Sequence, residues 1–123
     1  MDKIKLISAL IVSFIAQVVG GWDVMLQTWC VLAVLDIITG VICGISKKEL
    51  SSSIARHGFL KKVGSLIIVA VAVQLDRLFG TDTLRGAAIG FFIGVEGLSI
   101  IENWGGFGLP LPEKLKDVLK ELR

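Results

Sequence analysis

The sequence contains few of the residues that build metal sites and catalytic centres. Its 123 residues include one histidine, two cysteines and no tyrosine, and only 20% are charged. A single histidine gives no basis for a Ser/His/Asp or Cys/His arrangement, or for a metal site. We therefore predict that the protein is not an enzyme and uses no metal or other cofactor.

The scarcity of cysteine and of net charge excludes further classes. Cys30 and Cys43 lie in one apolar stretch. In a helix they would be about 20 Å apart, too far for a disulfide between them, so we interpret them as small apolar side chains. The net charge of +2 is too small to indicate nucleic acid binding, and no zinc-finger or helix-turn-helix signature occurs.

Apolar residues dominate instead, at 54% of the chain with a mean hydropathy of +0.79. A soluble domain of this size would aggregate with so much apolar surface, so lipid is the expected solvent. Four apolar stretches predict an all-α membrane protein with four transmembrane helices. Their approximate ranges are 6–22, 24–45, 60–79 and 84–104. The first stretch could instead be a signal peptide, but no clear cleavage site follows it.

The positive charges predict how these spans are oriented. A basic loop at 46–59 would separate the second and third spans, and a tail at 105–123 would follow the transmembrane domain 1–104. With both termini in the cytoplasm, eleven of the thirteen lysines and arginines lie inside, as the positive-inside rule expects. The predicted membrane-surface residues are Lys47, Lys48, Arg56, Lys61, Lys62, Lys114, Lys116 and Lys120. Asp76, Arg77, Asp82 and Arg85 are interpreted as boundary charges that make weak local pairs.

The loop and the tail both contain helix signals. Ser46 to Glu49 matches a capping box, so a short helix on the inner leaflet and an ordinary solvated loop remain alternatives there. In the tail, Pro112 suits the first turn of an amphipathic helix. Its apolar stripe comprises Leu111, Leu115, Val118, Leu119 and Leu122. We expect this helix to lie on the inner surface or against a neighbouring subunit, the alternative being a frayed solvated tail.

Two acids interrupt the apolar spans. Asp36 lies in the second span and Glu96 in the fourth, about 20 and about 18 Å from the outer boundary if both spans run inward. An aspartate at a span centre costs about 2.5–3.5 kcal/mol, so both acids should turn toward protein. With no lysine or arginine within either span, we expect protonated acids sharing hydrogen bonds, or acids facing water. The polar candidates are Asp36, Thr39, Gln74, Glu96 and Asn103. These side chains either line a pore or only lock the helices together.

Glycines mark the expected helix-packing faces. Gly40 and Gly44 share a face with Asp36, while the fourth span has a glycine repeat. The candidate packing residues are Gly40, Gly44, Gly86, Gly90, Gly94 and Gly97. A smooth face and an acidic face on one span favour a homo-oligomer, although a monomer could bury both within its own bundle.

Several segments together resemble a known family. They are "LDIITG" at 35–40, "KKELSS" and "HGFLKKV" at 47–63, "LRGAAIGFFIGVEGLSIIEN" at 84–103 and "GLPLPEKLKDVL" at 108–119. The ordered set is similar to the bacteriophage holins of family 4, the toxin secretion/phage lysis holins. The matching motif residues are Asp36, Thr39, Gly40, Glu96, Ser99, Glu102 and Asn103, and the resemblance gives none of them a catalytic role.

The resemblance implies a multi-pass protein of the bacterial host cytoplasmic membrane. Such proteins oligomerise and open holes that release an endolysin or, in some relatives, a toxin. The second hypothesis is a small proton or cation channel or transporter subunit that uses Asp36 and Glu96. A membrane anchor for a partner protein is a third. Release of folded cytosolic protein would separate a holin from a transporter, which changes only ion gradients.

Overall fold

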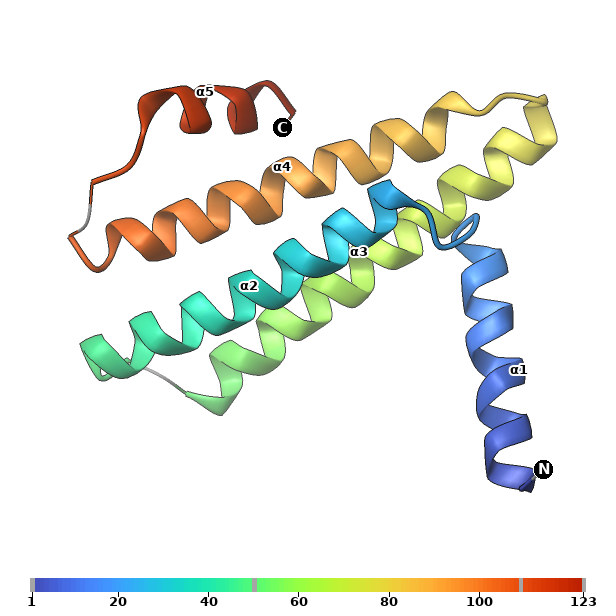
Figure 1. Ribbon diagram of the computed structural model, residues 1–123, viewed down its shortest axis with the longest axis horizontal. Coiled ribbons are helices and arrows are strands. Elements are labelled where there is room, and N and C mark those ends of the chain that lie inside the picture. Colours follow the sequence, from blue (N-terminus) through green and yellow to red (C-terminus); the bar gives the residue numbers. More distant parts are fainter. Residues whose placement is uncertain (1, 50, 109, 123) are drawn as a thin grey trace.

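The computed structural model describes residues 2–49, 51–108 and 110–122, and over these residues it is all-helical (Figure 1). The helices are α1 (Lys3–Val18), α2 (Val24–Lys47), α3 (Ser52–Phe79), α4 (Thr83–Gly105) and α5 (Glu113–Leu122). The predicted all-α class is confirmed.

Three helices of the described chain, α2, α3 and α4, are long and apolar enough to cross a membrane. The prediction of four spans is therefore met for three of them. Helix α1 is as apolar as the others but has 16 residues. At 1.5 Å per residue it is about 24 Å long, which is shorter than a hydrocarbon core of about 30 Å.

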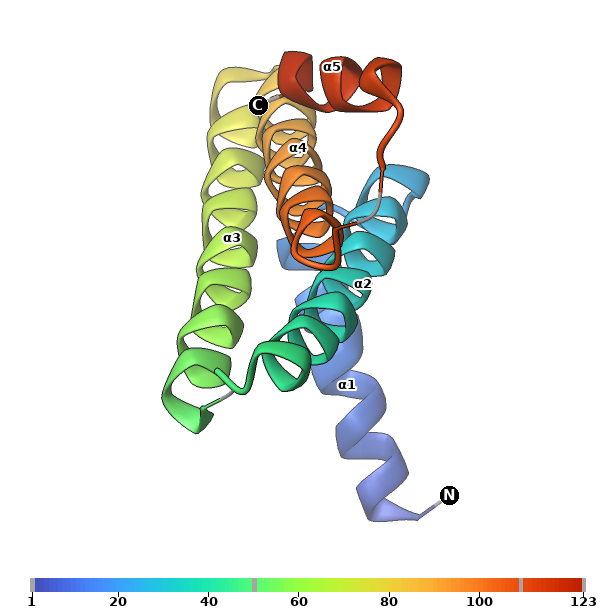
Figure 2. The ribbon, with the colours of Figure 1, turned by 90° about the vertical axis from the view of Figure 1, so that its left-hand side faces the viewer.

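Helix α4 is the centre of the bundle. Helices α2 and α3 pack on it, and α5 folds back along it, as Figures 1 and 2 show from two directions. In contrast, α1 leaves the bundle at a steep angle (Figure 1) and makes its few helix contacts with α3. Its side chains are exposed on all sides, as for Ile4 at 72% and Phe14 at 68%. Lipid or another protein must cover them.

The turn between α2 and α3 corrects the predicted loop at 46–59. Helix α2 continues to Lys47, and α3 begins at Ser52, so most of that loop is helical. The Ser46 capping box is wrong because Ser46 lies inside α2. Ser51 is the N-cap instead, with its hydroxyl accepting a hydrogen bond from the Ile54 N–H at 3.2 Å. The first turns of α3 are thus continuous with the third span.

The apolar core lies where α2 and α4 begin and α3 ends. Its buried members include Leu26 and Trp29 of α2, Val69 and Val73 of α3, and Ile89 of α4, which is only 1% exposed. Because this core occupies one half of the bundle, the other half depends on a different kind of contact.

A group of charges closes the core at this end. Asp76 of α3 is buried, at 6% exposure, and caps α4 by accepting from the N–H groups of Leu84 and Arg85 at 3.0 and 2.9 Å. It also accepts from the Thr81 hydroxyl at 2.7 Å. Asp82, the residue that precedes α4, makes no side-chain cap bond. The cap of α4 is therefore supplied by a neighbouring helix.

Arg85 joins α4 to the end of α1. Its guanidinium donates to the carbonyl oxygens of Val19 at 2.6 Å and Gly21 at 3.0 Å, and it pairs with the Asp23 carboxylate. The hydrogen bonds from Arg85, and then that from the Leu26 N–H, hold the pKa of Asp23 below its usual value. Gly20, between these acceptors, has φ +86° and lies so close to the Arg85 side chain that a Cβ would collide with it. We call Asp23, Asp76 and Arg85 the Arg85 clamp.

Candidate functional site

Three charged side chains meet where α2, α3 and α4 converge beyond the apolar core. Lys62 of α3 places its Nζ 2.8 Å from Oδ2 of Asp36 on α2 and 3.1 Å from Oε2 of Glu96 on α4. The side chains are 13%, 14% and 7% exposed respectively. We call these three residues the buried charge cluster. The structure thus brings the two acids of the sequence analysis together.

Lys62 corrects the sequence analysis in two ways. It was predicted at the membrane surface, and the two acids were expected to lack a basic partner. Its neighbour Lys61 is exposed, but Lys62 faces the bundle. Ser51 as an N-cap could have predicted this position. A helix that starts there places Lys62 about 16 Å along its axis, within the span and not at the membrane surface.

Asp36 is held by several donors. Besides Lys62, Ser99 donates to its Oδ1 at 2.6 Å and Asn103 donates to the same oxygen at 3.1 Å. Asn103 also donates to the Thr39 hydroxyl at 2.9 Å. A Cβ on Gly40 would lie 3.6 Å from the Asn103 amide nitrogen, so the glycine leaves room for this approach. Ser99, which the pattern of acids alone did not single out, completes the site.

Glu96 has a poorer set of partners. The whole residue is 5% exposed, and its Oε2 is completely buried. Among the described residues this oxygen has the ion-pair contact with Lys62 but no partner in hydrogen-bonding geometry. The two carboxylates are therefore not equivalent, although they share one ammonium group.

Gln74 does not join the cluster. It is exposed and lies twelve residues after Lys62 on α3, about 18 Å further along the helix. The glycines also separate into groups. Gly94 and Gly97 are buried within the chain, whereas a Cβ on Gly86 or Gly90 would meet open space. Gly44 is half-buried on α2.

Two open hollows reach the cluster. One, of about 420 Å³, lies between α2 and the start of α3 and is lined by Asp36, Lys62 and Asn103 among others. The other, of about 690 Å³, lies between α3 and α4 and reaches Asp36, Lys62, Glu96 and Ser99. The backbones of α2 and α3 each approach α4 more closely than they approach each other, so these hollows stay open beside the cluster.

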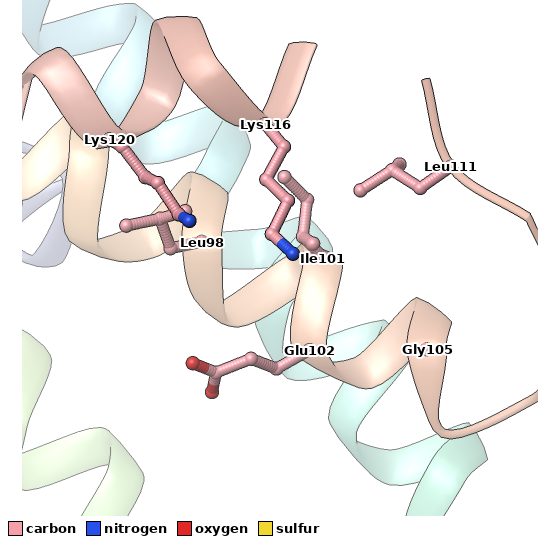
Figure 3. A pocket seen from close by; sticks show the side chains of 7 residues that line it. All are labelled: Leu98, Ile101, Glu102, Gly105, Leu111, Lys116 and Lys120. Atoms are coloured by element: carbon pink, nitrogen blue, oxygen red, sulfur yellow. The ribbon is translucent and has the colours of Figure 1, made fainter. Parts of the chain in front are cut away.

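A third hollow, of about 660 Å³, lies under α5 and away from the cluster (Figure 3). Lys116 and Lys120 extend toward Ile101 and Leu98 of α4, while the Glu102 carboxylate points away from both lysines. Leu115 and Val118 of the predicted apolar stripe are about half exposed, and the side chains of Leu119 and Leu122 lie outside the described residues. The two lysines that enter this hollow lie over apolar side chains and pair with no acid among the described residues, so it is not the candidate site.

Comparison with known proteins identifies the family. The model of the bacteriophage holin family matches residues 13–123, nearly the whole chain. The chain belongs to the bacteriophage holin family. A probable holin of Bacillus phage phi105 is 40% identical over 95 residues, covering 76% of this chain and 70% of the phage protein.

Bacterial relatives of this holin-family chain match it at similar levels. An uncharacterized 14.9 kDa protein in the nagH 3′ region of Clostridium perfringens is 48% identical over 105 residues, which cover 84% of this chain and 80% of the relative. An uncharacterized protein of Listeria monocytogenes is 37% identical over 101 residues, covering 81% and 72%. No solved structure matches the chain. The family and the three apolar helices make this a membrane protein.

Proposed function

We propose that this protein is a holin that oligomerises in the bacterial cytoplasmic membrane and forms holes. The holes let an endolysin reach the cell wall, or let a toxin leave the cell. Membership of the holin family and the similarity to the phage phi105 probable holin support this proposal. A membrane pore protein of this kind acts without catalysis.

The observation that carries the proposal is a buried charge cluster that open hollows reach from two sides. Charged side chains within spanning helices are costly unless protein or water covers them. Here two hollows lead to Asp36, Lys62 and Glu96 from between the helices. Lipid tails in these hollows would lie against charged groups that they cannot solvate. Neighbouring subunits or a water-filled lumen can solvate these groups. We infer that subunits close over these hollows and that the cluster becomes wetted when a hole opens.

The glycine face of α4 is the proposed contact between subunits. Gly86 and Gly90 are half-buried, and a side chain at either position would meet open space within the chain. Small residues let helix backbones approach closely in lipid. Gly94 and Gly97 lie on the same face but are already buried, so they contribute to packing within the chain.

The proposed topology places the α2–α3 turn and the C-terminal tail in the cytoplasm. Exposed cationic groups would then lie among the headgroups: Lys47, Lys48, Arg56, Lys61, Lys114 and Lys120. Lys116, the other residue predicted at the membrane surface, is half-buried and extends toward α4. In this proposal α1 also crosses, which puts the N-terminus inside. Because α1 stands at a steep angle to α2–α4 (Figure 1), crossing requires it to swing about Gly20 and Gly21. An N-terminal label reached by an impermeant reagent from outside would overturn the four-span arrangement.

Timed expression in bacteria, with and without a co-expressed endolysin, tests the proposed function. We expect abrupt lysis only when both proteins are present. Gly86→Leu with Gly90→Leu should prevent lysis while leaving insertion into the membrane intact. The control is Ala9→Leu, at an exposed small residue of α1 that lies away from α4 and from both hollows. Normal lysis timing in the α4 double variant would contradict the proposed subunit contact.

A proton or cation channel is the second candidate, favoured by the pairing of Asp36 and Glu96 with Lys62. Such a channel would collapse ion gradients without releasing folded protein. Measuring membrane potential and leakage of a cytosolic enzyme in the same culture separates the two. Loss of potential with retention of the enzyme and no endolysin access would replace the holin proposal by the channel.

A further inference from the structure

The charges of the buried cluster do not balance. Lys62 supplies one positive charge, and Asp36 and Glu96 would supply two negative charges if both were ionised. A net charge enclosed among spanning helices is strongly unfavourable, because little water is present to solvate it. One additional positive charge would remove this cost.

Among the described residues, no other side chain nearby supplies that charge. Facing Glu96 are Asp36 from α2 and Lys62 from α3, together with Ser99, which is uncharged, on α4 itself. Lys61 lines the rim of the same hollow but is exposed. The lysines of α5 that approach α4 lie over Leu98 and Ile101 and pair with neither acid among the described side chains (Figure 3).

We propose that the cluster is a binding site for one proton, which resides on the Glu96 carboxyl in the closed state. Asp36 accepts from Lys62, Ser99 and Asn103, a set of donors that stabilises a carboxylate. Glu96 has one ion-pair contact, and its Oε2 is buried without a hydrogen bond among the described residues. The proton therefore belongs on Glu96, and Lys62, Asp36 and protonated Glu96 together are neutral.

The proton site also gives the proposed holin a trigger, a step that rests on the proposed function. When water enters the hollows, Glu96 releases its proton to that water and becomes a carboxylate. The cluster then carries a net negative charge, which favours further wetting, and the two carboxylates repel each other, which favours separation of α2 from α4. Opening is thereby linked to loss of one proton per subunit.

Infrared spectroscopy of the full chain in lipid vesicles near neutral pH tests the charge balance. Exposed carboxyl groups are ionised under these conditions, so a carbonyl band from a protonated acid reports a buried one. We expect one such band in the wild type. It should disappear in Glu96→Gln, and also in Asp36→Asn, where Glu96 must ionise to balance Lys62. It should double in Lys62→Met, which leaves two acids without a cation.

Controls make the assignment specific. Glu102→Gln, at an exposed position on the same helix, should leave the band unchanged. Cell-free synthesis with carboxyl-labelled glutamate should shift the band, and labelled aspartate should not. Helical circular dichroism confirms that each variant has folded, and Glu96→Gln and Asp36→Asn preserve side-chain shape. The absence of a band in the wild type, or its persistence in Glu96→Gln, would overturn the proposal.

The trigger has its own readout. Glu96→Gln cannot acquire the negative charge, so cells expressing it with an endolysin should lyse later than wild type or not at all, with equal amounts of protein in the membrane. Unchanged lysis timing would overturn the trigger. If the band is present but the wild type releases nothing, the proton site stands and the holin function fails. If cells lyse but the band is absent, the holin function stands and the proton site fails.

Discussion

The Arg85 clamp and the buried charge cluster both join helices through charge, but they do so with different partners. In the clamp, Arg85 and Asp76 bind mainly backbone groups at helix ends, which need partners in any state of the protein. In the cluster, Lys62 and Glu96 contact other side chains, whose charges can change. The clamp is therefore suited to fixing the fold and the cluster to switching it.

The largest effect is expected at the cluster. Lys62→Met removes the cation and leaves two buried acids together, which should lower stability by about 3–5 kcal/mol. Unfolding in mixed detergent micelles measures the change, with Lys61→Met as the exposed neighbour control. An equal effect of the two substitutions would mean that Lys62 does not hold the cluster together.

A smaller effect is expected where the clamp caps α4. Asp76→Ala removes the acceptor of two backbone N–H groups and one hydroxyl, at a cost of about 2 kcal/mol. Asp82→Ala serves as the control because Asp82 makes no side-chain cap bond. The same assay measures the free energy of unfolding of both variants. If Asp76→Ala lowers it more than Lys62→Met does, the cluster is not the larger contributor to stability.

The turn after α1 sharpens the role of Arg85. Gly20 and Gly21 both have positive φ, so alanine strains either one, but only at Gly20 would the new Cβ meet Arg85. Gly20→Ala should therefore be less stable than Gly21→Ala by about 1 kcal/mol. Limited proteolysis between α1 and α2 gives a local readout, and cleavage at equal rates in the two variants would contradict the close contact.

The smallest effect is expected when a fall in pH protonates Asp23. Because the pKa of Asp23 is lowered in the folded protein, its contribution is present above the usual aspartate range and is lost as the pH falls through the lowered value. The side chain is 48% exposed, so solvent screening keeps the effect small. Proteolysis of the α1–α2 turn should accelerate in acid, and Asp23→Asn should remove that acceleration.

Much of the fold could be predicted because long apolar runs specify helices in lipid whatever their partners. Counting residues also placed Asp36 and Glu96 at similar depth, and the structure brings both to Lys62. The sequence could not predict which way individual polar side chains face around the helix axis. Lys61 and Lys62 are adjacent in sequence yet face opposite environments, and Gln74 faces outward although it is polar within an apolar span.

The clamp was missed for a related reason. Local spacing pointed to pairs among Asp76, Arg77, Asp82 and Arg85, whereas Arg85 reaches residues more than sixty positions away. Such contacts depend on how helix ends are brought together by packing, which spacing along the chain does not encode. The steep departure of α1 is likewise a tertiary feature, since its composition resembles that of a span.

The position of Lys62 between its two acids also affects how the bundle assembles during synthesis. During synthesis the ribosome delivers an acid with α2, a base with α3 and a second acid with α4. In a nascent hairpin of α2 and α3 the charges of Asp36 and Lys62 already neutralise each other. The hairpin can therefore remain in the membrane without an uncompensated charge. The last helix then arrives with a carboxyl for which no countercharge is left.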